Sequence, residues 1–301
     1  MRILLAASLA LLAACGTDSA APGQPDGPPI ADGGGSGSDG FLTMISQSWS
    51  LQPGEQTYLC VRVTVSSDIY VKSIRPISPL GTHHSVLMLA SHPTVPDGTT
   101  TCTSMLTDPA IYASGVGTVD LDFPDGVGLH VKAGQQLFLN LHLFNLGEAV
   151  LTGTSGIEYL PAEPSEIVHE AGSVLAGKTT GLVVVPGTSS QTGTCTTPAN
   201  ETIFAVAPHM HLLGSHMTAT YQATGSDAPV TVLDTDYSFD DQKFRPVDPE
   251  MVTAAGGKYV VTCSYVNSTG STVYFGESTE DEMCFAMTYV YPALDEATCT
   301  K

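Results

Sequence analysis

Short apolar runs fill the chain from Phe41 onward, and turn-forming Gly, Pro, Asp and Asn residues separate them. Many runs alternate apolar with polar positions and are rich in Val, Thr, Tyr and Phe, a pattern typical of β-strands. We expect strands over residues 57–65, 84–90, 135–144, 154–160, 179–185, 202–214, 216–224, 259–266 and 283–292. No helical periodicity persists for long enough to predict a substantial helix.

This pattern predicts an all-β protein built from two tandem antiparallel β-sandwich domains with a jelly-roll-like architecture. A polar, proline-bearing stretch at residues 161–172 separates two sets of strands, so we expect domains at residues 41–165 and 166–301. Residues 16–40 are rich in Gly, Pro, Ser and Asp. Such a composition cannot bury a core, and it predicts a flexible tether.

The first 15 residues resemble a bacterial lipoprotein signal, with a basic residue, an apolar segment and a final cysteine. The apolar segment from Ile3 to Ala14 is too short to span a bilayer as a stable helix, and Cys15 would carry the lipid. The alternative is an ordinary secretory signal. Both interpretations predict an exported protein, and lipidation predicts a membrane-anchored one in the bacterial cell envelope, on the periplasmic or outer-surface face.

Charge and cysteine content narrow the functional classes. The formal net charge of −20, from 10 basic and 30 acidic side chains, argues against a nucleic-acid partner. Seven cysteines are present, and with Cys15 assigned to the lipid an even number remains, which favours disulfides in an exported chain. Their positions suggest one bridge in the first domain and two in the second.

Two histidines near the middle of the chain have the spacing of a metal-binding pair. His209 and His211 lie two residues apart in a predicted strand, so their side chains face the same side, with Met210 on the opposite side. A pair with this spacing can bind one ion, although packed or exposed histidines also occur in strands.

Other histidines are less informative when taken alone. His142 alternates with a row of leucines, so it should point away from the leucine-lined core. His83 and His84 are adjacent, and strand alternation turns them to opposite faces unless the backbone bends nearby, for which residues 79–82 are the candidate. Four further histidines lie in no motif: His92, His130, His169 and His216.

Met283, beside Cys284 in "DEMCFAMTYVYP", changes the interpretation of these histidines. The ordered set His-His, His, His-x-His and Met-Cys resembles the copper type II ascorbate-dependent monooxygenases, the family of peptidylglycine α-hydroxylating and dopamine β-monooxygenases. The similarity runs from about residue 47 to residue 299, and it includes "LFLNLHLF", "PHMHLLG" and "FRPVDPEMVTAAGGKYVVTC". Several motifs in the same order are more specific than any one of them.

The resemblance implies two copper ions per chain, each with its own ligands. The electron-transferring copper of the first domain would be bound by His83, His84 and His142, and the catalytic, O2-binding copper of the second by His209, His211 and Met283. A thioether ligand favours Cu(I). The resemblance also implies three disulfides: Cys60–Cys102, Cys195–Cys299 and Cys263–Cys284.

The chain departs from the peptide-hydroxylating branch at the substrate-binding positions. That branch binds its substrate's carboxylate through an Arg, an Asn and a Tyr, where this chain has Ala207, Phe285 and Met287. A carboxylate would have no charged or phenolic partner at these positions, so we expect a small and rather apolar substrate. The alternative is that Phe285 and Met287 simply pack in the core.

The predicted function is hydroxylation of a C–H bond with O2 and ascorbate or another one-electron reductant, by a monomeric protein. One alternative is a non-catalytic copper-binding or copper-sensing envelope lipoprotein with the same fold. A second is a hydrolytic zinc site, against which Met283 argues, because zinc sites prefer Cys, His and carboxylate ligands.

Overall fold

The computed structural model describes residues 39–90, 95–102, 108, 110–226, 228–294 and 298–300. The proposed signal with Cys15, nearly all of the tether and His92 lie outside these ranges. Strands dominate the described part, where the helical structure is the short 3₁₀ helix η1 (Pro164–Glu166), so the all-β prediction is confirmed. Within the same ranges, no helix has the length and apolar character needed to cross a lipid bilayer.

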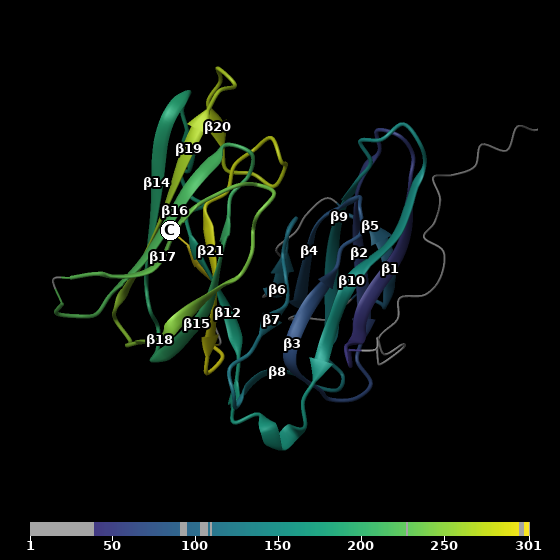
Figure 1. Cartoon of the computed structure of the whole chain (residues 1–301), viewed down its shortest axis with the longest axis horizontal. Helices are drawn as coiled ribbons and strands as arrows, with labels where there is room; N and C mark the ends of the chain where they lie inside the picture. Colours follow the sequence, from purple (N-terminus) through teal and green to yellow (C-terminus); the bar gives the residue numbers. More distant parts are fainter. Residues whose placement is uncertain are drawn as a thin grey trace, which may run out of the picture.

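Two sheets packed face to face form the first sandwich (Figure 1). One sheet has the order β1-β10-β3-β8-β11, with β7 paired to β3. Its strands are β1 (Leu42–Leu51), β3 (Ile69–Ile77), β7 (Leu121–Asp122), β8 (Val127–Val131), β10 (Leu151–Pro161) and β11 (His169–Glu170). The other sheet has the order β5-β2-β9-β4-β6. Its strands are β2 (Gln56–Thr64), β4 (Thr82–Leu89), β5 (Gly98–Thr101), β6 (Ala110–Ser114) and β9 (Gln136–Phe144).

The second sandwich contains most of the remaining strands (Figure 1). Its first sheet, β18-β15-β21-β12-β22, consists of β12 (Gly172–Gly177), β15 (Glu201–His209), β18 (Arg245–Thr253), β21 (Phe285–Tyr291) and β22 (Thr298–Thr300). Its second sheet, β14-β19-β16-β17, consists of β14 (Gly187–Thr196), β16 (Gly214–Gln222), β17 (Val230–Asp236) and β19 (Lys258–Asn267). A small ribbon pairs β13 (Val183–Val184) with β20 (Val273–Tyr274).

Among the described strands, pairing is antiparallel in both sandwiches except at two short contacts, where β11 runs parallel to β8 and β22 runs parallel to β12. The first contact fastens the segment that connects the sandwiches, because β11 follows η1 and returns to the edge of the first sheet. There His130 Nδ1 lies 3.0 Å from a carboxylate oxygen of Glu170.

The alternation in β9 fixes where its side chains go. One face consists of leucines fully buried between the two sheets, as the sequence predicts: Leu137, Leu139, Leu141 and Leu143. The opposite face, with Phe138, Asn140 and His142, is buried as well. Part of it is covered by the Cys60–Cys102 disulfide, whose Cys102 Sγ lies 3.5 Å from Asn140 Nδ2. His142 therefore points away from the leucine core without reaching solvent.

Strands β15 and β21 lie in the sheet of the second sandwich that faces the first sandwich (Figure 1). Both are buried on both faces, which accounts for their nearly continuous apolar sequences. One face packs in the core of the second sandwich, and residues of the other face join the core of the first, among them Ala207, Met287 and Tyr289. Phe244 bridges the interface, with its ring 5.5 Å from that of Tyr112 and 5.4 Å from that of Tyr289.

Disulfides occur in both sandwiches. Cys60–Cys102 lies in the first and Cys263–Cys284 in the second, the pairings that the resemblance implies. Cys195 is also disulfide-bonded. Cys299 lies in β22, of which the structure describes the backbone and not the side chains, so the Cys195–Cys299 pairing stays a prediction.

Candidate metal centre

A β-bulge brings His83 and His84 to the same side of β4. Thr82 pairs with Leu143 and His84 pairs with His142, so His83 is an extra residue in the register of β4 and β9. In a bulge two residues of one strand oppose one residue of its partner, which relieves the strict alternation of faces. The expected irregularity therefore exists: Gly81 has a positive φ of 99°, and the bulge follows it at His83.

The three rings converge through their Nδ1 atoms. Nδ1 of His83 lies 2.8 Å from Nδ1 of His142 and 3.2 Å from Nδ1 of His84. One possible ligand atom from each ring lies within 4.8 Å of the others. Aromatic rings enclose the group. The Tyr58 ring stacks on the His142 ring with 4.1 Å between their centres, and the centre of the Phe239 ring lies 4.6 Å from that of His83.

Burial keeps all three imidazoles neutral. Burial first, and neighbouring histidines second, lower the pKa of His83 to about 3 and that of His142 to about 4. The pKa of His84 lies well below its ordinary value for the same reasons. Each of these short contacts between neutral rings can hold one N–H···N hydrogen bond. A bound cation would take the place of the protons between the Nδ1 atoms. The donor set fits a metal that accepts three imidazoles, as copper and zinc do.

Gln56 fixes the orientation of the His142 ring. Its side-chain amide lies 2.7 Å from Nε2 of His142. The amide atom in contact is Nε2, whose N–H donates to Nε2 of His142. A ring that binds a metal through Nδ1 would carry its proton on Nε2 instead, and the Gln56 amide would accept from it through Oε1 after a half-turn of its end group. His84 differs, because its buried Nε2 has no hydrogen-bond partner among the residues described.

The second group is presented through the other ring nitrogen. His209 is the last residue of β15 and His211 follows in the turn to β16, while Met210 turns the opposite way into the core of the second sandwich. Nδ1–H of His209 donates to Oε1 of Gln242 at 2.8 Å. Nδ1–H of His211 donates to the carbonyl oxygen of Asp281 at 3.1 Å.

These two hydrogen bonds leave Nε2 as the lone-pair nitrogen of each ring. The rings lie 5.4 Å apart and nearly perpendicular to each other. Burial lowers the pKa of both, that of His211 to about 3, so both are neutral near pH 7. Neutral imidazoles with fixed tautomers are suited to bind a metal without rearrangement.

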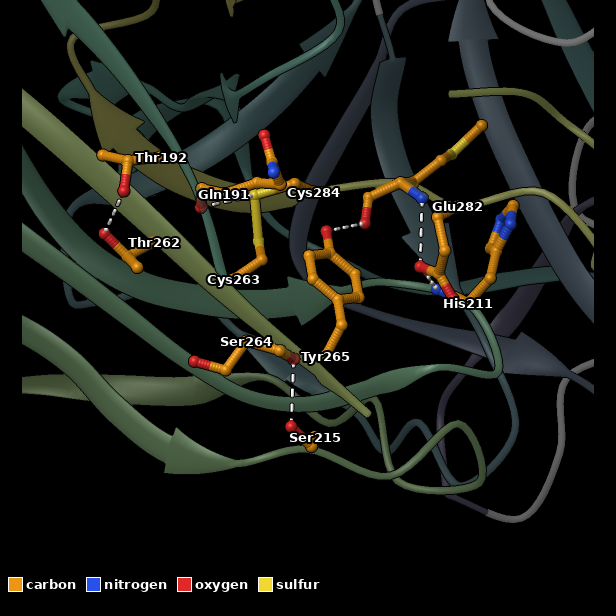
Figure 2. The surroundings of a disulfide bond; sticks show 11 residues. Gln191, Thr192, His211, Ser215, Thr262, Cys263, Ser264, Tyr265, Glu282 and Cys284 are labelled. Atoms are coloured by element: carbon orange, nitrogen blue, oxygen red, sulfur yellow. Dashed lines mark hydrogen bonds between the residues drawn. A yellow bond between two sulfur atoms is a disulfide. The ribbon is translucent and has the colours of Figure 1, made fainter. Parts of the chain in front are cut away.

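Met283 lies just before β21, deep in the same region. Its carbonyl oxygen accepts a hydrogen bond of 2.8 Å from the Tyr265 hydroxyl, and the next residue is tied by the Cys263–Cys284 disulfide. The residue before it, Glu282, is fully buried and accepts hydrogen bonds from backbone N–H groups of the His211 turn (Figure 2). Burial raises the pKa of Glu282 to about 7, against these N–H donors, which lower it.

One pocket between the sandwiches brings the two groups together. It measures about 750 Å³ with its open mouth, and His84, His209, His211 and Met283 all line it. The rest of its wall is largely apolar and comes from both sandwiches, with Val86, Ala110, Ala113, Leu175, Ala207, Phe285 and Met287. The three residues singled out from the sequence as substrate-pocket candidates thus all lie in this wall.

Other histidines lie elsewhere. His216 lies on the surface between Asp234 and Asp236, at 2.8 Å and 2.9 Å, and these carboxylates raise its pKa. It therefore has a surface role. His169, in β11, stacks on Tyr291 at 5.5 Å.

Several site residues escaped the sequence analysis. Gln56, Tyr58 and Gln242 are polar or aromatic residues of ordinary appearance, and their roles depend on which strand or loop lies next to which histidine. For Glu282 the sequence carries a weak signal of a structural role, because an acidic side chain shortly before a buried apolar strand needs a buried partner.

Comparison with known proteins finds similarity to this family of monooxygenases over much of the chain. Residues 169–301 match the family described as "Copper type II ascorbate-dependent monooxygenase, C-terminal domain". DBH-like monooxygenase protein 1 of Mus musculus is 25% identical over 86% of this chain and 48% of its own length. DBH-like monooxygenase protein 2 of Mus musculus is 24% identical, over 81% and 45%. The chain thus spans about half the length of these curated relatives.

Proposed function

Because the chain belongs to the copper type II ascorbate-dependent monooxygenase family, we propose that it is a copper-dependent monooxygenase acting on a small, neutral and largely apolar substrate. One oxygen atom of O2 enters a C–H bond of the substrate, and the other leaves as water. The two electrons this requires come from ascorbate or a similar one-electron donor, and two protons accompany them.

One observation supports the proposal: two sets of side chains suited to hold a metal reach a single, largely apolar pocket, the first through His84 and the second through His209, His211 and Met283. The first would hold copper through the Nδ1 atoms of His83, His84 and His142, and the second through Nε2 of His209 and His211 with the Met283 sulfur. Copper at these positions would supply one-electron redox chemistry and activation of O2. A thioether favours Cu(I), the state that reacts with O2, which supports assigning O2 to the second set.

The protein's own contribution is to orient the ligands and to keep water out. Gln242 and the Asp281 carbonyl fix the tautomers of His209 and His211, so each presents Nε2 without a change of protonation. The apolar wall leaves few hydrogen-bonding partners for water near the reacting carbon. Exclusion of water protects a reactive intermediate from side reactions.

The pocket wall also supports the substrate class. Ala207, Phe285 and Met287 offer no charge and no hydroxyl, and the wall as a whole carries no Lys, Arg, Asp or Glu. A carboxylate or an ammonium group would lose its hydration here without gaining a partner. A neutral, apolar molecule gains by burial instead.

The disulfides indicate an oxidising, extracytoplasmic compartment. A lipid on Cys15 would hold the enzyme at an envelope membrane through the tether. Mass spectrometry of the N-terminal peptide from protein made in a bacterial host tests the anchor, since a free, unmodified Cys15 thiol would contradict it.

Copper binding and O2 uptake test the activity. The protein should bind two copper ions and consume O2 with ascorbate only when a suitable C–H donor is present. Met283→Ile should lose Cu(I) at the second set and lose turnover, whereas Met251→Ile, in β18 and outside the pocket, should retain both. Two bound copper ions without substrate-dependent O2 uptake would favour a non-catalytic copper protein.

A further inference from the structure

We propose that Glu282 is a positioning residue, which holds His211 and Met283 in one arrangement so that the second set is assembled before the metal arrives. The inference rests on the proposed function, because it takes these side chains to be copper ligands. It concerns a residue that touches neither metal nor substrate.

The Glu282 carboxylate joins two segments that are far apart in the sequence. One oxygen, Oε2, accepts hydrogen bonds from backbone N–H of His211 at 3.0 Å and of Met283 at 3.2 Å. The other, Oε1, accepts from backbone N–H of Leu213 at 2.7 Å. Figure 2 shows the carboxylate directed at His211, in the region that leads to the Cys263–Cys284 disulfide.

Neither segment is held there by a regular β-ladder. Strand β15 ends at His209 and β16 begins at Gly214, so His211 and Leu213 lie in the turn between them. Met283 lies between an isolated bridge at Glu282 and the start of β21 at Phe285. Buried backbone N–H groups need acceptors, and the carboxylate supplies what a neighbouring strand supplies elsewhere.

Asp281, the residue before Glu282, also contacts His211. The carbonyl oxygen of Asp281 accepts from Nδ1–H of His211, so two consecutive residues fix the ring and the backbone of His211 together with the backbone of Met283. Glu282 itself does not line the pocket, and both its oxygens are occupied by backbone N–H groups. This geometry distinguishes a positioning role from a general acid or base.

A carboxylate is the side chain that suits this position. An ionised carboxylate only accepts hydrogen bonds, whereas glutamine replaces one of its oxygens with an NH2 donor. In Glu282→Gln that donor would face either Leu213 N–H or the N–H groups of His211 and Met283. The variant keeps the shape of the side chain and breaks the connection between the two segments.

The first test is Cu(I) affinity of Glu282→Gln, measured by competition with a Cu(I) chelator, with X-ray absorption to detect sulfur bound to copper. We expect the second Cu(I) to bind 10–100-fold more weakly and to lose its sulfur neighbour, the range typical for groups that orient metal ligands. The three-histidine site should be unchanged. Wild-type affinity with the sulfur signal retained would overturn the proposal.

Glu201→Gln is the matched control. Glu201 lies in β15, is a buried carboxylate like Glu282, and likewise does not line the pocket. The variant should bind both copper ions with wild-type affinity and keep the sulfur signal. A loss equal to that of Glu282→Gln would mean that any buried charge in this sandwich has the same effect, and would overturn the proposal.

Amide hydrogen exchange of the metal-free wild type tests the same point without a variant that must fold. The amides of His211 and Leu213 should exchange far more slowly than those of the exposed turn at Thr224 and Gly225. Equal exchange would overturn the proposal. If the wild type binds no second copper, or binds it without sulfur, the copper assignment fails instead, and the exchange experiment still decides the role of Glu282.

Discussion

Single hydrogen bonds decide which nitrogen each candidate ligand presents. The first group converges through Nδ1 while the second offers Nε2, because Gln242 and the Asp281 carbonyl occupy the Nδ1 atoms of His209 and His211. Nδ1 lies closer to the backbone than Nε2, so the choice of nitrogen also sets how near the metal lies to its strand. A metal held by the adjacent pair His83 and His84 would thus lie close to β4.

Removing the hydrogen-bond partner of His142 tests this account at the residue scale. Gln56→Leu deletes the amide that hydrogen-bonds Nε2 of His142 and leaves the ring less firmly oriented. We expect copper at the three-histidine site to bind about 10-fold more weakly, with the second site unaffected. Competition with a chelator measures both. Gln222→Leu, in β16 and away from the pocket, is the control, and an equal loss in the two variants would contradict the prediction.

Glu201 makes stability depend on pH. Burial raises its pKa, so the folded state holds this proton more tightly than the unfolded chain does. Its contribution is fully present below the ordinary pKa of about 4.5 and is lost as the pH rises through the folded-state pKa. Glu201→Gln should therefore gain stability relative to wild type as the pH rises above about 4.5, where the carboxyl of the unfolded chain ionises. Urea denaturation across this range checks it, and parallel pH profiles would refute it.

At the scale of strands, the bulge in β4 is the feature that builds the first group. It follows Gly81, whose φ of 99° lies in the left-handed region that favours glycine. A Cβ at this position would lie 2.8 Å from side-chain atoms of Trp49 and Leu151. The turn therefore needs glycine for its backbone and for its neighbours.

Gly81→Ala tests the importance of this turn. Both the positive φ and the close contacts should destabilise the variant, by about 2–4 kcal/mol together. Gly54→Ala is a matched control, because Gly54 also has a positive φ of 75° but nothing within 4 Å of an added Cβ. Thermal and urea unfolding should show a clearly larger loss for Gly81→Ala, with weaker copper binding at the three-histidine site. Similar losses in the two variants would contradict the steric argument.

Much at the scale of strands could be predicted from the sequence. The leucine alternation of β9 gave the orientation of His142, and the His-x-His spacing gave the shared direction of His209 and His211 with Met210 opposite. Local periodicity carries this information because the faces of a strand alternate. It does not carry the position of the bulge, which depends on how β4 and β9 align.

Other parts of the site depend on contacts between distant segments. Gln242 comes from the connection between β17 and β18, at a sequence separation of 33 from His209. Gln56 comes from β2, at a sequence separation of 86 from His142. No spacing rule connects such pairs. The motif order made the ligands predictable, but the groups that orient them required the structure.

At the scale of the whole molecule, the site belongs to neither sandwich alone. His84, Val86 and Ala113 reach the pocket from the first, and His209 and Met283 reach it from the second. The shared apolar layer at β15 and β21 holds the two together. Packing between the sandwiches therefore controls the shape of the pocket as well as the stability of the fold.

A bulky side chain in the pocket separates substrate binding from copper binding. Ala113 lines the pocket and is not among the proposed ligands, so Ala113→Phe would fill part of the space for substrate. We expect KM for an apolar substrate to rise about 10-fold or more, with two copper ions still bound. Steady-state kinetics and metal analysis check this, with Ala223→Phe in an exposed turn as control. An unchanged KM would show that the substrate binds elsewhere.

The central claim is that this chain inserts one oxygen atom of O2 into a C–H bond. Its most direct test is mass spectrometry of small, neutral molecules after incubation with the copper-loaded protein, ascorbate and ¹⁸O2. The account predicts a product that carries one labelled oxygen, formed by the wild type and not by Met283→Ile. Two bound copper ions with no labelled product from a broad panel of apolar C–H donors would contradict it.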